Sequence, residues 1–197
     1  EYYELVLLED PDNLKSQEAL ERLLEVPELR LRAASILTTT YDHQGAAEPL
    51  TRVLMIGLDD KNKDVSEKVN ILTRIADLRE RRLSDPRGAF DALAQAFSMY
   101  PDKDELRTEM ARLASENGFN EQYATVIDKA IPTVENDMTL TSRLMSEAAR
   151  LYDEKMGDVA RAETAYRRLL DFNPDNTETA MPAVKALERI LTGGESW

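Results

Sequence analysis

The sequence predicts an all-α protein in which short helices follow one another along the chain. Ala, Glu, Lys, Leu and Arg make up almost half of the 197 residues, a composition typical of long helices and helical arrays. Gly and Pro contribute only 7 and 8 residues, and 6% of residues are aromatic, which argues against a β-sandwich or a barrel. Turn-like segments recur between amphipathic stretches, at residues 10–12, 100–102 and 173–175, and such repetition indicates a repeat architecture.

The first part of the chain follows this pattern least regularly. Residues 2–8 resemble the end of a second helix whose partner is missing. A shorter helix is predicted from Leu14 to Val26, closed by Pro27, because proline disfavours a helical conformation in the residue before it. Two helices follow, one on each side of Gly45. The number of helices before residue 79 is odd, so we predict an irregularity near residues 26–28: a kink, an extra helix or a change of stacking.

The central helices carry clear start and stop signals. The apolar spacing of residues 72–78 predicts a helix that ends before residues 84–86. There Asp85 can cap the next helix, and Pro86 falls where a missing N–H costs nothing. Asp102 and Glu105 resemble the capping box that starts the following helix.

The last part of the chain contains the clearest unit. Gly118 and Gly157 each predict the end of a first helix. Asp175 and Glu178 repeat the expected cap, and the final helix runs from about residue 178 to residue 191. Residues 193–197 resemble a turn that enters another second helix, so we expect the chain to be a segment of a longer array.

The repeating pattern resembles the tetratricopeptide repeat. That signature has a tyrosine or small residue late in a first helix, a glycine at the turn, then Ala-x3-aromatic and a proline after the second helix. The matching residues here are Tyr152, Gly157, Ala162, Tyr166 and Pro174, with one extra residue between Tyr152 and Gly157. No tryptophan opens any unit, and the spacing is not a strict 34 residues. The chain looks like the divergent form common in large bacterial repeat proteins.

The resemblance implies a right-handed α-solenoid of antiparallel helix pairs, with about ten or eleven helices in a single domain over residues 1–197. The approximate units are 1–28 (irregular), 29–67, 68–105, 106–139, 140–178 and 179–197 (partial). Small residues should let paired helices approach closely, and they stand at Gly57, Ala89, Ala96, Ala130 and Ala162.

The same resemblance implies a function in protein–protein interaction, because the first helix of each pair lines a concave groove in such arrays. By register, the expected partner-binding positions are Ser35, Thr39, Asn70, Thr73, Asp77, Thr108, Arg112, Arg143, Ser146 and Arg150. A small hydroxyl recurs in all four units, and arginines can form forked hydrogen bonds to carboxylates of a peptide. The lysines and asparagines of chaperone-binding members are largely absent, so that ligand is not expected.

The charge balance narrows the class of partner. The chain carries 38 acidic and 25 basic side chains, a formal net charge of −13. Nonspecific nucleic-acid binding depends on Lys and Arg that neutralise phosphates, so we expect no nucleic-acid partner. No segment approaches the roughly 18 apolar residues of a membrane span, so we expect no membrane insertion. A cytoplasmic location is favoured, and a targeting segment can lie outside this chain.

No residue pattern indicates catalysis or a cofactor. There is no cysteine, and His43 is the single histidine, placed where a helix C-terminus favours a cation. Residues 59–64 superficially resemble a calcium loop but lack its central glycine and closing glutamate. No glycine-rich phosphate loop or nucleophile motif is present. We therefore expect no metal, no cofactor and no enzymatic activity.

One alternative function stays open. The array can be an architectural spacer or a self-association module that has no peptide ligand. Methionines often line adaptable binding surfaces. We interpret the apolar residues Met55, Ile56, Met99 and Met110 instead as parts of the core.

Overall fold

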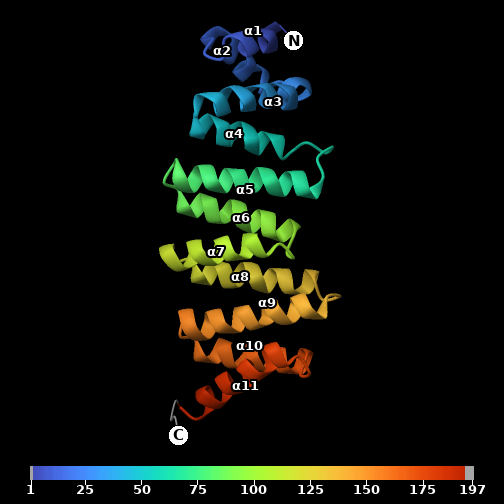
Figure 1. The fold of residues 1–197 in the computed structure, drawn as a ribbon, viewed down its shortest axis with the longest axis vertical. Coiled ribbons are helices and arrows are strands. Elements are labelled where there is room, and N and C mark those ends of the chain that lie inside the picture. The colour runs from blue at the N-terminus through green and yellow to red at the C-terminus, as the bar shows by residue number, and fades with distance from the viewer. Residues whose placement is uncertain (1, 194–197) are drawn as a thin grey trace. The chain divides into compact units, whose positions relative to one another are not determined.

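The computed structural model describes residues 2–193, which form eleven α-helices and contain no strand (Figure 1). The predicted all-α class is confirmed. The chain divides into two compact units, Glu1–Tyr100 and Pro101–Trp197. The predicted turn at residues 193–197 lies largely outside the described residues. None of the described helices is both long enough and apolar enough to cross a lipid bilayer.

The first unit consists of six helices, and each packs against the next one along the chain. Their bounds are α1 (Tyr2–Glu9), α2 (Leu14–Leu23), α3 (Pro27–Gln44), α4 (Ala47–Gly57), α5 (Val65–Arg81) and α6 (Pro86–Met99). The side chains of Leu37, Leu50, Leu72, Phe90 and Phe97 are fully buried between them. Apolar burial between sequence neighbours therefore stabilises this unit.

The second unit contains five α-helices and two short irregular turns of helix. Their bounds are α7 (Asp104–Asn117), α8 (Asn120–Ala130), η1 (Ile131–Thr133), α9 (Met138–Arg150), η2 (Leu151–Lys155), α10 (Val159–Phe172) and α11 (Thr177–Leu191). Each helix again packs on its neighbour in sequence, and α9 also touches α11. Met110, Leu113, Tyr123, Ile127 and Leu144 form the most buried part of its core.

Near residue 26, where we predicted a kink, an extra helix or a change of stacking, the structure has a short turn between two helices. Helix α2 ends at Leu23, and Pro27 is the first residue of α3. The prediction that this helix runs to Val26 and is closed by Pro27 was wrong. Proline fits the first turn of a helix, where its missing N–H has no helical partner in any case.

The helix start at Asp85 was predicted correctly. Its carboxylate accepts a hydrogen bond from the backbone N–H of Gly88 at 2.8 Å, and Pro86 is the first residue of α6. The left-handed glycines Gly45 (φ +63°) and Gly118 (φ +76°) end α3 and α7, as expected from their freedom to adopt positive φ.

Two other predicted caps were wrong by one or two residues. Helix α7 begins at Asp104 after Lys103, whose side chain makes no capping bond, so Asp102 does not cap it. Helix α11 is capped by Asn176, not Asp175; the Asn176 side chain accepts from the N–H of Glu178 at 3.2 Å.

Four of the five small residues predicted at helix contacts are buried: Ala89, Ala96, Ala130 and Ala162. A Cβ added at Gly57 would meet no atom within 4 Å, so this glycine does not serve close helix packing.

Helix α9 continues into a turn of π-helix, Leu151–Lys155. Its backbone is widened, because the N–H of Met156 bonds to the carbonyl of Leu151, five residues earlier, at 3.1 Å. A π turn accommodates one residue more than the same stretch of α-helix. This turn overlaps the segment from Tyr152 to Gly157, where the sequence has one residue more than the tetratricopeptide pattern.

Candidate functional site

The ten predicted groove residues lie on the outer surfaces of four helices. Each of these side chains is exposed or half-exposed. Ser35 and Thr39 belong to α3, and Asn70, Thr73 and Asp77 belong to α5, all in the first unit. The second unit contributes the remaining five, namely Thr108 and Arg112 of α7 and Arg143, Ser146 and Arg150 of α9.

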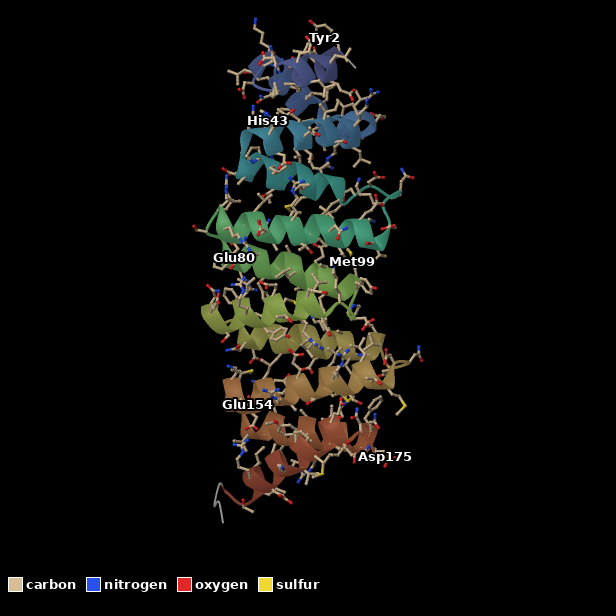
Figure 2. All side chains as sticks on the ribbon, in the orientation of Figure 1. Tyr2, His43, Glu80, Met99, Glu154 and Asp175 are labelled. Atoms are coloured by element: carbon tan, nitrogen blue, oxygen red, sulfur yellow. The ribbon has the colours of Figure 1, made fainter. Side chains whose placement is uncertain are left out.

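Four of the five residues in the second unit line one open cleft of about 490 Å³. Thr108 comes from α7, and Arg143, Ser146 and Arg150 come from α9. The π turn contributes Glu154, labelled in Figure 2, and Lys155, while α8 and α11 complete the lining. We call this site the α7–α9 cleft.

The arrangement of α9 follows from its sequence. Asp137 caps the helix by accepting from the N–H of Leu140 at 2.9 Å. Leu140, Leu144 and Ala148 recur at helical spacing and are buried. The positions 143, 146, 147 and 150 share a neighbouring face, which borders the cleft.

A network of charged side chains forms one wall of the cleft. The Arg107 guanidinium donates to Asp104 at 2.8 Å, and its Nε lies 3.2 Å from a carboxylate oxygen of Glu147. Tyr123 donates its hydroxyl to the other carboxylate oxygen of Glu147. Arg143 lies 3.5 Å from Asp104. The wall is thus held by ion pairs and a phenol between α7, α8 and α9.

Glu147 is the most perturbed carboxylate of this wall. Burial of its carboxyl group raises the pKa of Glu147, and this effect outweighs the opposite effects of the Tyr123 hydroxyl and the Arg107 guanidinium. The pKa of Tyr123 is also raised, first by burial and then by the adjacent Glu147 charge.

The cleft is rich in cations, although the chain as a whole is strongly acidic. Arg107, Arg143, Arg150 and Lys155 face two carboxylates, those of Glu147 and Glu154. Arg150 is bonded to Glu154 at 3.2 Å. Lys155 forms no ion pair within residues 2–193, and the Nε of Arg143 is buried without a hydrogen-bond partner.

Ser146 and Thr108 add hydroxyl groups to the cleft. Thr108 donates to the carbonyl of Asp104 at 3.0 Å within its own helix, so its oxygen remains available as an acceptor. Arg112 does not line the cleft, because its guanidinium is bonded to Glu109 and Glu116 on α7 at 2.9 and 2.8 Å.

The predicted residues of the first unit are separated. Ser35 and Thr39 line a smaller pocket of about 290 Å³ between α1 and α3, which also contains His43. On α5, Thr73 donates to the carbonyl of Val69 at 2.9 Å, and Asp77 pairs with Arg81 at 2.9 Å. Two of the predicted groove residues, Thr73 and Asp77, are therefore bonded within their own helix.

Sequence reasoning missed Arg107, Tyr123, Glu147 and Lys155. Tyr123 and Glu147 are 24 residues apart, and no local pattern joins them. The extra residue before Gly157 was the signal for Lys155, because the π turn places this lysine beside the cleft.

No group of three or more His, Cys, Asp or Glu side chains in the described part of the chain is arranged to hold a metal ion.

The chain was compared with known proteins in sequence and in structure. No family model and no curated protein matches the sequence. Among solved structures, the crystal structure of BtubC (BKLC) from P. vanneervenii is similar over 93% of this chain and 89% of its own chain, at 16% identity and a TM-score of 0.40. This likeness assigns neither a family nor a function.

Proposed function

We propose that this chain is a non-enzymatic protein-interaction module of the tetratricopeptide type, built as a right-handed solenoid of antiparallel helix pairs. Three observations support the proposal. Helices pack on their sequence neighbours within each unit, glycines end α3 and α7, and alanines stand at the helix contacts. Such an architecture presents extended surfaces without a common globular centre.

The α7–α9 cleft is the proposed peptide-binding site, and its ligand is an acidic segment of a partner protein. The observation that carries this proposal is the gathering of four cations in an open cleft of a chain with net charge −13. One of them, Lys155, has no ion pair among the described residues. A ligand carboxylate would pair with this lysine.

The wall of the cleft is formed before a ligand arrives. Arg107, Asp104, Glu147 and Tyr123 hold one another through the bonds described above. A preformed site loses less conformational entropy on binding than a site that must be ordered by its ligand. Ser146 and Thr108 can then accept hydrogen bonds from the peptide backbone.

Fluorescence anisotropy can test the proposal. The probe is a labelled peptide in which glutamates alternate with serines, compared with the same peptide carrying glutamines. We expect Arg150→Glu and Lys155→Glu each to weaken binding of the acidic probe about tenfold. Lys129→Glu on α8 is the matched control, because Lys129 is an exposed lysine of the same unit outside the cleft lining. Equal losses in all three variants would reject the cleft as the binding site.

A self-association function is the second candidate, and exposed apolar helix faces favour it. Tyr2, Leu5 and Leu8 are 63–74% exposed on α1, and Met181 and Leu191 are more than half exposed on α11. Exposed apolar patches commonly mark interaction surfaces. Light scattering across protein concentration tests this function: association that Leu5→Lys abolishes supports it, and a monomer at every concentration refutes it.

A further inference from the structure

The first unit carries a larger depression that the proposed function does not use. Its volume is about 1020 Å³, and its lining comes from the α2–α3 turn, α3, α4, the end of α5 and the α5–α6 connection. Its apolar floor includes Leu31, Met55, Ile56 and Leu83. Met55 is 48% exposed, so the interpretation of this methionine as a core residue was wrong, as it was for Met99. We call this site the α4 depression.

Two of the three arginines that line the depression, Arg52 and Arg79, are occupied by acceptors of the chain itself. Arg52 forms two bonds to Glu21, at 2.8 and 2.6 Å. Arg79 donates to the carbonyl of Gly88 at 3.2 Å and lies 3.5 Å from the sulfur of Met55. Arg30 is the lining arginine that keeps cationic capacity for a ligand, because the carboxylate of Asp59 lies 4.0 Å from it.

The carboxylates of the rim are less occupied. Arg30 lies 4.0 Å from Asp59, at the limit of an ion pair. The side-chain carboxylates of Glu25 and Glu48 have neither a hydrogen-bond partner nor an ion pair within 4.0 Å among the described residues, although the charge of Glu25 acts on Arg52. The lining holds four carboxylates (Glu25, Glu48, Asp59 and Asp85) and three arginines, so the balance of charge around the apolar floor is negative, the opposite of the α7–α9 cleft.

We propose that the α4 depression binds an amphipathic helix of a partner protein, with an apolar face against Met55 and Leu83 and basic residues toward Glu25 and Glu48. A helix satisfies its own backbone hydrogen bonds, so it needs no donors from the depression. An extended peptide would need several donors along its length, and Arg52 and Arg79 do not supply them because both are already bonded within the chain. The flexible thioether of Met55 lets the floor adapt to the side chains of the helix.

This second site extends the proposed scaffold function. The two units then select partners of opposite charge, an acidic segment in the second unit and a basic amphipathic helix in the first. Each site uses residues of its own unit alone.

The test uses the whole chain and a labelled helical peptide of leucine and lysine, about 18 residues long, with the leucines on one face. A scrambled peptide of the same composition controls for general attraction to an acidic protein. We expect the amphipathic peptide to bind about tenfold more tightly than the scrambled peptide. Equal binding of the two peptides would overturn the proposal.

Substitutions in the floor separate apolar docking from simple charge attraction. Met55→Glu adds a negative charge, so it should strengthen a purely electrostatic interaction but weaken docking onto the floor. We expect weaker binding. Glu48→Lys should also weaken binding, more than Glu9→Lys, an equal charge change on α1 outside the depression. Unchanged or tighter binding to the Met55→Glu variant rejects the site.

Three further measurements complete the test. Urea denaturation of the Met55→Glu variant, followed by circular dichroism, should give a cooperative transition, which shows that the first unit is folded. The acidic probe of the α7–α9 cleft should bind this variant as it binds the wild type, because that cleft lies in the second unit, and this keeps the two proposals independent. Light scattering tests whether the occupant of the depression is instead a second copy of this chain, and we expect the wild type to be monomeric. If the wild type dimerises and Met55→Glu is monomeric, the depression is a dimer interface and the proposed partner is wrong.

Discussion

Tyr152 and Asp128 join the π turn to α8: the phenolic hydroxyl of Tyr152 donates a hydrogen bond to the Asp128 carboxylate. The guanidinium of Arg161 lies 4.7 Å above the Tyr152 ring, a cation–π contact. The same kind of bond recurs elsewhere, in the pairs Tyr41–Glu21, Tyr123–Glu147 and Tyr166–Asp153. A tyrosine ring buries apolar area while its hydroxyl needs a partner, so each pair ties the packing of one element to the polar face of another.

Removing the Tyr152 hydroxyl should destabilise the protein modestly. In Tyr152→Phe the ring stays packed and one hydrogen bond is lost. Asp128 is exposed, so water can solvate its carboxylate, and we expect a loss of about 1 kcal/mol in the free energy of unfolding. Urea denaturation measures it. Tyr100→Phe, at an exposed tyrosine, serves as the control and should change little.

Tyr123→Phe should cost more than Tyr152→Phe. The hydroxyl of Tyr123 bonds to Glu147 and to the carbonyl of Arg107 at 3.2 Å. Glu147 is only partly exposed, so its carboxylate would lose a partner where water replaces it poorly. We expect a loss of about 2–3 kcal/mol by the same urea measurement. A cost equal to that of Tyr152→Phe would contradict the argument from burial.

Alkaline pH should destabilise the native protein through Tyr152. Burial, together with the bond to Asp128, raises the pKa of Tyr152 from 10.0 to about 12. A raised pKa in the native state means that the stabilisation is complete below the unfolded pKa of 10.0 and is lost as pH rises toward about 12. The stability difference between wild type and Tyr152→Phe should therefore shrink across this interval. Urea midpoints in steps of pH, with tyrosinate absorbance of the folded protein, measure both changes.

Between pH 4 and neutral pH, the stability of the native protein should depend on the ionisation of Glu147. Because burial raises the pKa of Glu147 above 4.5, its contribution to stability is fully present below pH 4.5 and declines as pH rises through the native pKa. Glu147→Gln cannot ionise, so its stability relative to wild type should improve from pH 4 toward neutral. All other carboxylates are present in both proteins, so their effects on stability cancel when the wild type is compared with Glu147→Gln. A difference that is constant with pH would show that the native pKa is not raised.

Local signals explain what could be predicted from the sequence. Asp85 and Pro86 determine a helix start within their own neighbourhood, and the structure has the start there. At Asp175 two capping residues stand side by side, and the pattern alone does not tell which one caps; the structure uses Asn176. Local residue patterns therefore locate an element while leaving its first residue uncertain by one or two positions.

Contacts across helices explain what could not be predicted. The sequence identifies Met55 as an apolar residue, but it cannot show that no neighbouring helix fully covers this side chain. Glu147 is likewise one of many acidic residues until the packing of α7, α8 and α9 places it beside Arg107 and Tyr123. The unpaired Lys155 of the α7–α9 cleft is therefore visible in the structure alone.

The π turn gives the last prediction, because it links one extra residue to the proposed binding site. Deleting Glu154 should let Leu151–Lys155 return to α-helical register and rotate Lys155 away from the cleft. We expect the deletion to weaken binding of the acidic probe about tenfold, with helix content by circular dichroism retained. Glu154→Ala removes the same side chain without changing the register and frees Arg150 from its partner, so this control should bind the probe at least as well as wild type. Equal losses in the deletion and in Glu154→Ala would show that the widened turn does not orient Lys155, and that Glu154 itself supports the site.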